Sequence, residues 1–82
     1  MEHSKEIADA VTTLIKLMVD HPEGVRVESV PIPDGVSLRI SVDSADIGKV
    51  IGKQGRIAKS IRTLLGAAGM KVKRRFTLEI LE

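Results

Sequence analysis

The chain contains no cysteine, tyrosine or tryptophan, a single phenylalanine, and no long apolar run. Without cysteine, neither disulfides nor thiolate-bound zinc can stabilise the fold, so a small core of Ile, Val and Leu must do so. No stretch approaches the roughly 20 apolar residues that a bilayer span requires. The first ten residues are polar and carry acids, unlike a secretory signal. These absences predict a soluble, cytoplasmic protein without membrane contact.

Residues suited to catalysis or metal binding are also scarce. The two histidines, His3 and His21, form no i, i+4 pair. Asp43 and Asp46 lie near an expected helix start, where carboxylates ordinarily cap the helix or compensate its dipole. The run Gly48–Gln54 lacks both the glycine spacing and the hydroxyl residue of a phosphate-binding P-loop. The sequence therefore predicts no enzyme, no metal, no cofactor and no small-molecule substrate.

The length and the charge distribution of the chain limit the number of domains and the class of ligand. Its 82 residues allow one small core, and 43% of them are hydrophobic, so we expect a single folded domain over residues 1–82. Segment 47–75 holds nine cations and no acid, whereas the remainder holds four cations and all eleven acids. Phosphates respond to local potential rather than to net charge. A charge run alone is more often a solvated surface, but this one can also attract a polyanion.

Hydrophobic periodicity predicts the first half of the fold. An apolar stripe indicates a helix from Ser4 to about Asp20, with Ser4 as its cap. That stripe comprises Ile7, Val11, Leu14, Ile15 and Met18. β-branched residues over 25–32 and strict alternation over 36–43 predict two strands. The turn residues 33–35 between them favour an antiparallel hairpin. Its core-facing residues are expected to be Val36, Leu38, Ile40 and Val42.

The second half is expected to contain two helices and a strand. Asp43 or Ser44 can cap a short helix over residues 45–51. A further helix should begin after residue 55, and Gly66 and Gly69 mark its expected end. Its apolar stripe comprises Ile57, Ile61, Leu64, Leu65 and Ala68. Alternation over residues 76–80 predicts a third strand. The element order is α-β-β-α-α-β, an α+β fold.

The tetrapeptide Gly52-Lys53-Gln54-Gly55 lies between the two later helices. Its glycines permit a tight turn and let a sugar-phosphate chain approach without meeting a β-carbon. Gly55 opens the following helix, whose free amides and positive dipole end favour a phosphate. A bare G-x-x-G is most often only a corner between helices. Here apolar flanks, the position between helices and the acid-free segment coincide, which favours a phosphate-binding loop.

The run Val50-Ile51-Gly52-Lys53-Gln54-Gly55-Arg56-Ile57 resembles the signature of KH domains, whose G-x-x-G loop clamps about four nucleotides of single-stranded nucleic acid. The element order resembles the type II KH fold, a three-stranded mixed sheet backed by three helices. Because the resemblance covers essentially the whole chain, the sequence is similar to the KhpA (YlqC-like) family of small stand-alone bacterial KH proteins. The resemblance implies binding of single-stranded RNA in post-transcriptional regulation or as an RNA chaperone. It also implies pairing with a second copy or with a larger KH-containing protein, KhpB.

The resemblance further implies an apolar groove between the loop helices and a strand, which holds bases while the loop holds phosphates. By position, Ile51, Ile57 and Ile61 would form its floor, with Ile40 or Val42 contributing from the strand. The expected RNA-binding residues are Ile40, Lys49, Ile51, Gly52, Lys53, Gln54, Gly55, Arg56, Ile57, Lys59 and Ile61. With Phe76 as the single aromatic residue, base stacking of the RRM or OB-fold type is disfavoured.

One competing hypothesis belongs to another functional class. A KH fold can serve as a dimerisation or adaptor module with weak or no nucleic-acid binding, because a fold does not determine a function. The loop separates the two hypotheses. An adaptor needs neither Lys53 nor an acid-free segment from Ile47 to Arg75.

Overall fold

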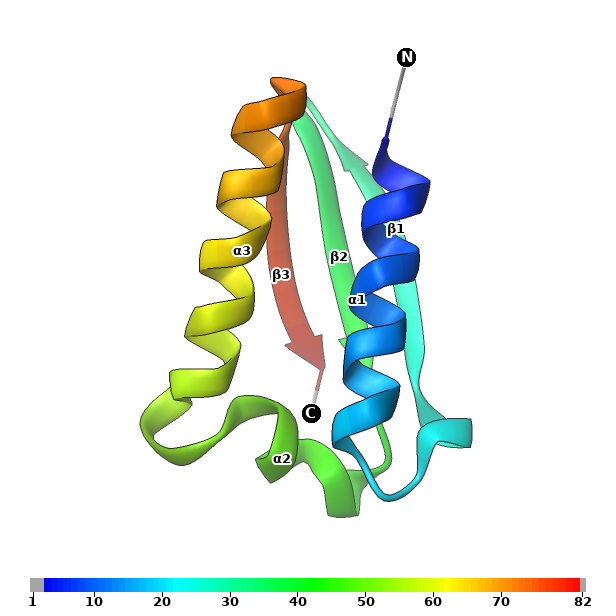
Figure 1. The fold of residues 1–82 in the computed structure, drawn as a ribbon. Coiled ribbons are helices and arrows are strands. Elements are labelled where there is room, and N and C mark those ends of the chain that lie inside the picture. The colour runs from blue at the N-terminus through cyan, green and yellow to red at the C-terminus, as the bar shows by residue number, and fades with distance from the viewer. Residues whose placement is uncertain (1–2, 82) are drawn as a thin grey trace.

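The computed structural model describes residues 3–81, in which two long helices lie over one face of a three-stranded sheet and a short third helix lies at one end of this helical layer (Figure 1). The helices are α1 (Ser4–Met18), α2 (Ile47–Ile51) and α3 (Arg56–Val72). The strands are β1 (Arg26–Ile32), β2 (Gly35–Ser41) and β3 (Arg75–Leu81). This arrangement confirms the predicted α-β-β-α-α-β order and the α+β class. Within the described residues, no helix has the length and apolar character that a bilayer span requires.

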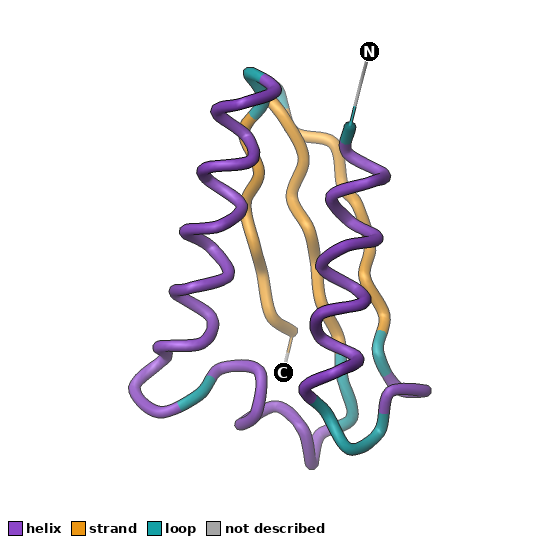
Figure 2. The backbone as a smooth tube through the Cα atoms, in the orientation of Figure 1, coloured by secondary structure: helices purple, strands orange, loops and turns teal. Residues whose placement is uncertain are grey.

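The sheet is mixed, with β2 at its centre. β2 pairs with β1 in antiparallel orientation through a turn at residues 33–34, which confirms the predicted hairpin, and it pairs with β3 in parallel orientation. Figure 2 shows the strands behind α1 and α3. Because side chains alternate along a strand, Leu38 and Leu78 face the helices together. On the opposite face Arg39 pairs with Glu79, at 3.0 Å between Nε and Oε1.

The hydrophobic core lies between the helices and the sheet. Its fully buried aliphatic side chains come from three different elements: Ile15 from α1, Leu38 and Ile40 from β2, and Val50 from α2. Each fully buried side chain of this size contributes about 1.5–3 kcal/mol relative to exposure. Val42, predicted to face the core, is only half-buried and packs at its edge. Val50 therefore ties the short helix α2 into the same core as α1 and the sheet.

The helix boundaries partly correct the sequence prediction. Ser4 is the first residue of α1, not its cap, because His3 occupies the cap position without a side-chain cap bond. Asp43 does cap the turn that precedes α2, since its Oδ1 accepts a hydrogen bond from the Ala45 amide at 2.9 Å. The predicted helix from residue 45 is thus a 3-10 turn, Ser44–Asp46, followed by α2.

The end of α3 also differs from the prediction. The helix continues through Gly66 and Gly69 and ends at Val72, and its C-cap residue Lys73 has a left-handed backbone with φ 59°. Gly69 does not end the helix. A glycine is required there because the following chain passes close to the helix backbone. A Cβ at this position would lie 2.3 Å from the Arg74 carbonyl oxygen and 3.2 Å from the Phe76 ring. The chain can therefore return this closely into β3 only because residue 69, inside the helix, has no side chain.

The two glycines of α3 give a matched test of this close approach. Gly69→Ala should lower the free energy of unfolding by at least about 2 kcal/mol, because the new methyl group overlaps the Arg74 carbonyl. Gly66→Ala should raise it by up to about 1 kcal/mol, because nothing lies within 4 Å of its Cβ position and alanine favours a helix. Urea unfolding of both variants measures the difference. Equal effects would contradict the assigned role of Gly69.

Candidate nucleic-acid interface

The segment Gly52–Gly55 forms an exposed corner between α2 and α3, at the end of the molecule away from the β1–β2 turn (Figure 1). Its backbone has positive φ at Gly52 (77°), Gln54 (57°) and Gly55 (72°). The side chains of Lys53 and Gln54 are exposed. A Cβ at Gly52 would lie 2.6 Å from Ile57 Cγ1, so this glycine lets the loop pack against the first turn of α3.

Some of the loop amides are already used. The Gly52 amide donates to the Gly48 carbonyl at 2.8 Å, and the Gly55 amide donates to the Gly52 carbonyl at 3.2 Å. The Arg56 amide donates to the Lys53 carbonyl. The sequence predicted that the amides at the start of this helix are free to bind a phosphate. The amides of Gly55 and Arg56 are instead bonded within the loop. These bonds hold the corner in shape, and the attraction for an anion rests on the side chains and on the dipole of α3.

The start of α3 has an unusual charge distribution. Its first turn contains no acid, whereas Arg56 and Lys59 are exposed there and Lys53 precedes them. A helix N-terminus carries a partial positive charge, so cations at this end are unfavourable unless an anion is present. Among the described residues none of these three cations has an ion-pair partner, although Arg56 donates to Gln54 Oε1 at 3.2 Å. The corner is therefore a concentrated, uncompensated positive site.

The other expected binding residues are placed less favourably. Lys49 is turned toward the segment that follows α1, where its Nζ lies 3.2 Å from Asp20 Oδ2. Ile40 is fully buried and Ile61 is 4% exposed, so both are core residues that present almost no surface to a ligand. The apolar surface beside the loop is reduced to half-buried Ile51 and Ile57, which is 37% exposed. The structure thus brings together the loop and its flanking isoleucines, but not Ile40 or Lys49.

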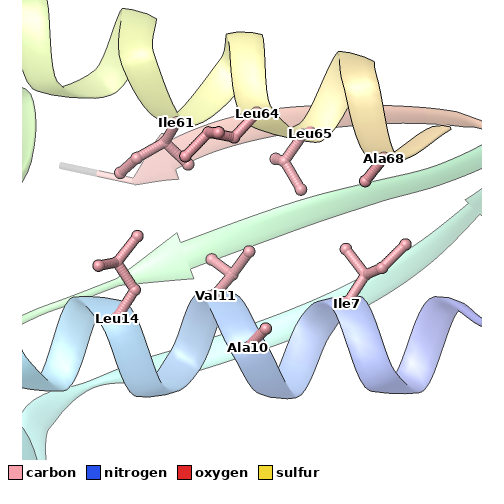
Figure 3. A pocket seen from close by; sticks show the side chains of 8 residues that line it. All are labelled: Ile7, Ala10, Val11, Leu14, Ile61, Leu64, Leu65 and Ala68. Atoms are coloured by element: carbon pink, nitrogen blue, oxygen red, sulfur yellow. The ribbon is translucent and has the colours of Figure 1, made fainter. Parts of the chain in front are cut away.

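The apolar groove that reaches Ile61 lies between α1 and α3 rather than between the loop helices and a strand (Figure 3). It has a volume of about 190 Å³ and its lining residues are all aliphatic. They are Ile7, Ala10, Val11, Leu14, Ile61, Leu64, Leu65 and Ala68. Figure 3 shows the side chains of the two helices directed toward each other across the groove. Leu64 is 64% exposed, so the predicted core stripe of α3 is partly a surface.

A buried carboxylate beneath the loop was not anticipated. Asp46 is fully buried and accepts hydrogen bonds from the amides of Asp20 (3.2 Å) and His21 (2.9 Å). Its Oδ2 also lies 3.1 Å from His21 Nδ1, and its Oδ1 lies 3.5 Å from Lys49 Nζ. The cluster ties the chain after α1 to the start of α2. His21 keeps 45% of its side chain exposed but is held by Asp46, and the 25 residues that separate the two partners in the sequence hide this contact from sequence analysis.

This cluster shifts the pKa values of its members. The hydrogen bond to Asp46, together with the charges of Asp43 and Asp46, raises the pKa of His21. Burial alone would raise the pKa of Asp46, but the hydrogen bonds from the Asp20 and His21 amides and from the His21 ring outweigh it, and the pKa of Asp46 is lowered. The hydrogen bond to Asp20 raises the pKa of Lys49. The folded state thus favours charged forms of all three groups.

The His21–Asp46 pair should make stability depend on pH. Because folding raises the pKa of His21, its contribution is complete below the unfolded value of about 6.5 and is lost as the pH rises through the folded value. Because folding lowers the pKa of Asp46, its contribution is present above the unfolded value near 3.8 and is lost in acid. The melting temperature should therefore decline as the pH rises through neutrality.

His21→Gln should flatten that decline, and His3→Gln is the matched control because His3 lies at the other end of α1 and contacts Glu6 instead. Thermal melts at closely spaced pH values provide the measurement. A wild-type slope that survives in His21→Gln would exclude the pair as its source.

Comparison with known proteins gives a consistent family. Residues 8–80 match the family model described as KhpA/KhpB, KH domain. The chain is 43% identical over 74 residues to the RNA-binding protein KhpA of Listeria monocytogenes, covering 90% of this chain and 97% of that protein. It is 46% identical over 76 residues to the protein of the same name from Aquifex aeolicus (93% and 96%). It is 40% identical over 78 residues to that from Bacillus subtilis (95% and 96%).

A solved structure supports the fold independently. The crystal structure of Aquifex aeolicus Era bound to GDP and aluminium fluoride aligns with 98% of this chain at a TM-score of 0.68 and 18% identity. The aligned part is 31% of that longer chain. At this level of identity the similarity concerns the fold, and it agrees with the three-stranded mixed sheet and three helices of the type II KH arrangement.

Proposed function

Because this chain belongs to the KhpA/KhpB family of KH domains, we propose that it binds single-stranded RNA and holds about four nucleotides at the Gly52–Gly55 loop. One observation carries the proposal. An exposed, glycine-bounded corner leads into a helix N-terminus whose first turn carries cations and no acid. A polyphosphate strand is the ligand class that compensates such a charge distribution.

The proposed binding mode divides the ligand between two kinds of surface. Phosphates lie against the loop, where Lys53, Arg56 and Lys59 supply charge and the dipole of α3 adds to it. Bases lie against Ile51 and Ile57, the partly exposed apolar residues beside the loop. Without aromatic stacking, affinity rests mainly on phosphate contacts, so sequence selectivity is loose.

The wider role follows from the same family. We propose that residues 1–82 act as one KH domain in the cytoplasm, as a regulator or chaperone of RNA, and that the domain binds RNA without altering it covalently. The names of the relatives support RNA binding as their activity. Within residues 3–81, no three His, Cys, Asp or Glu side chains are grouped as metal ligands.

The loop assignment is tested by reversing its charge. Lys53→Asp with Gln54→Asp should lower affinity for a short single-stranded RNA by at least about a hundredfold, because attraction to the phosphates becomes repulsion. Aspartate tolerates the left-handed backbone at residue 54, so the melting temperature should change little. Fluorescence anisotropy at several salt concentrations measures the affinity.

A double variant of α1, Thr13→Glu with Lys16→Glu, changes the net charge by the same amount on an exposed face away from the loop. It should retain most of the wild-type affinity. Full affinity in the loop variant, or an equal loss in both variants, would refute the loop as the binding site.

A second candidate function is pairing with another KH domain, and the groove between α1 and α3 is the observation that favours it. Its lining is uncharged, and Leu14 and Leu64 on opposite sides are 38% and 64% exposed. The occupant we propose is a second copy of this chain, because a two-fold axis would let Leu64 of each copy enter the groove of the other and repeat the contact. Pairing with a larger KhpB-like protein through the same surface is the heterodimeric form of this proposal.

Pairing is tested by placing a charge at the exposed rim of the groove. Leu64→Glu should shift the protein from dimer to monomer and weaken self-association by at least about tenfold, since burying an unpaired carboxylate is costly. Met70→Glu is the control, because Met70 is an exposed apolar residue of α3 that does not line the groove. Sedimentation equilibrium distinguishes the species. A wild-type monomer at high concentration, or unchanged association of Leu64→Glu, would exclude the groove.

A further inference from the structure

The turn between α3 and β3 forms a second basic surface, which we call the α3–β3 turn and define as residues 71–75. Four of its five residues are cations: Lys71, Lys73, Arg74 and Arg75. It lies at the opposite end of α3 from the loop, beside the β1–β2 turn (Figure 1). Since α3 has 17 residues, the two basic ends of the helix are separated by about 25 Å. They therefore form two separate basic surfaces, one at each end of α3.

The α3–β3 turn borders a broad depression with a volume of about 510 Å³. Lys73, Arg74 and Arg75 line it, and Asp34 is the acid among its lining residues. Lys73 and Arg75 are exposed, and within residues 3–81 neither has an ion-pair partner. Met70, 83% exposed, adds an apolar rim. The depression thus combines unpaired cations with a surface that a sugar or base can contact.

The ordinary structural role of cations at a helix C-terminus does not account for this cluster. Such cations usually bond the last carbonyl groups or offset the dipole. Here the Gly69 and Met70 carbonyls already accept from the backbone amides of Lys73 and Arg74. Lys71 borders a different depression, with Glu6 of α1, and can serve the dipole. Lys73 and Arg75 remain, two positions apart and without a described ion-pair partner, and the acid that lines the same depression, Asp34, cannot balance both of them.

We propose that the α3–β3 turn is a second phosphate-binding site, in which Lys73 and Arg75 contact the sugar-phosphate backbone of an RNA strand longer than the segment held at the loop. This inference rests on the proposed function, because it concerns the same ligand. The site is independent of base sequence, since its contacts are charges rather than base-edge donors and acceptors. A strand bound at both ends of α3 is held extended or bent along the molecule, which suits a protein that keeps RNA unpaired.

The test compares RNA length in a matched pair of variants. Lys73→Gln with Arg75→Gln removes two charges from the turn, and Lys5→Gln with Lys16→Gln removes two from α1. Wild type and both variants are titrated with a homopolymer of about four nucleotides and with one several times longer. The turn variant should bind the short RNA as wild type does. It should bind the long RNA on the order of tenfold more weakly near 0.1 M salt, with a salt slope lower by about 1.4, or 0.7 for each lost contact.

The remaining outcomes separate this inference from the proposed function. If wild type binds neither RNA, the proposed function fails. If wild type binds the short RNA but the turn variant binds the long RNA as tightly as wild type and the α1 control do, the loop assignment stands and the second site is refuted. An equal loss for short and long RNA in the turn variant, with an unchanged melting temperature, also refutes a separate site. A loss of affinity confined to long RNA and absent from the α1 control supports it.

Discussion

The buried carboxylate of Asp46 is the contact on which the position of the Gly52–Gly55 loop depends. α2 has five residues, which is too short for a helix that is stable by its own hydrogen bonds. It is held instead by the burial of Val50 and by the bonds that Asp46 accepts from the Asp20 and His21 amides. Removing a buried, bonded carboxylate would leave those amides unsatisfied. The loop can therefore be exposed, and can hold Gln54 in a left-handed backbone, because the helix before it is firmly anchored.

The long helix α3 carries out several roles on separate faces and ends. One face packs on the sheet through Ala58, Ile61 and Leu65. Its N-terminal turn presents cations to the loop, and its C-terminal end leads into the second basic turn. A rigid helix keeps these two basic surfaces at a constant separation. An RNA strand that contacts both ends of α3 would therefore have to span a fixed distance. The buried side chains of α3 and the exposed cations of its first turn are therefore different residues.

The polar and apolar surfaces are also separated. The positive charge gathers at the two ends of α3, whereas the groove between α1 and α3 is lined by aliphatic residues alone. A phosphate strand gains nothing from the groove, and an apolar partner gains nothing from the loop. The two candidate functions therefore use different parts of the molecule and are compatible in one chain. RNA binding and pairing together would raise affinity through a second linked site.

The sequence by itself determined the features that depend on neighbouring residues. Alternation over residues 36–40, turn chemistry at Pro33–Gly35 and the glycine-bounded loop are local, and they gave the element order, the hairpin and the family. The loop residues themselves could be identified in the same way, because G-x-x-G between two helices is a contiguous signal.

Only the tertiary structure decided which of these residues meet across the chain. Asp46 pairs with His21 across 25 residues of sequence, so an expected capping acid anchors α2, and Lys49 is turned toward Asp20 and Asp46. Leu64, expected in the core stripe of α3, is largely exposed because a groove separates α3 from α1 at this position. The need for a glycine at residue 69 is also visible only in the structure, where Arg74 and Phe76 pass close to this residue. Periodicity gives the face of a helix, but the distance between helices follows from packing.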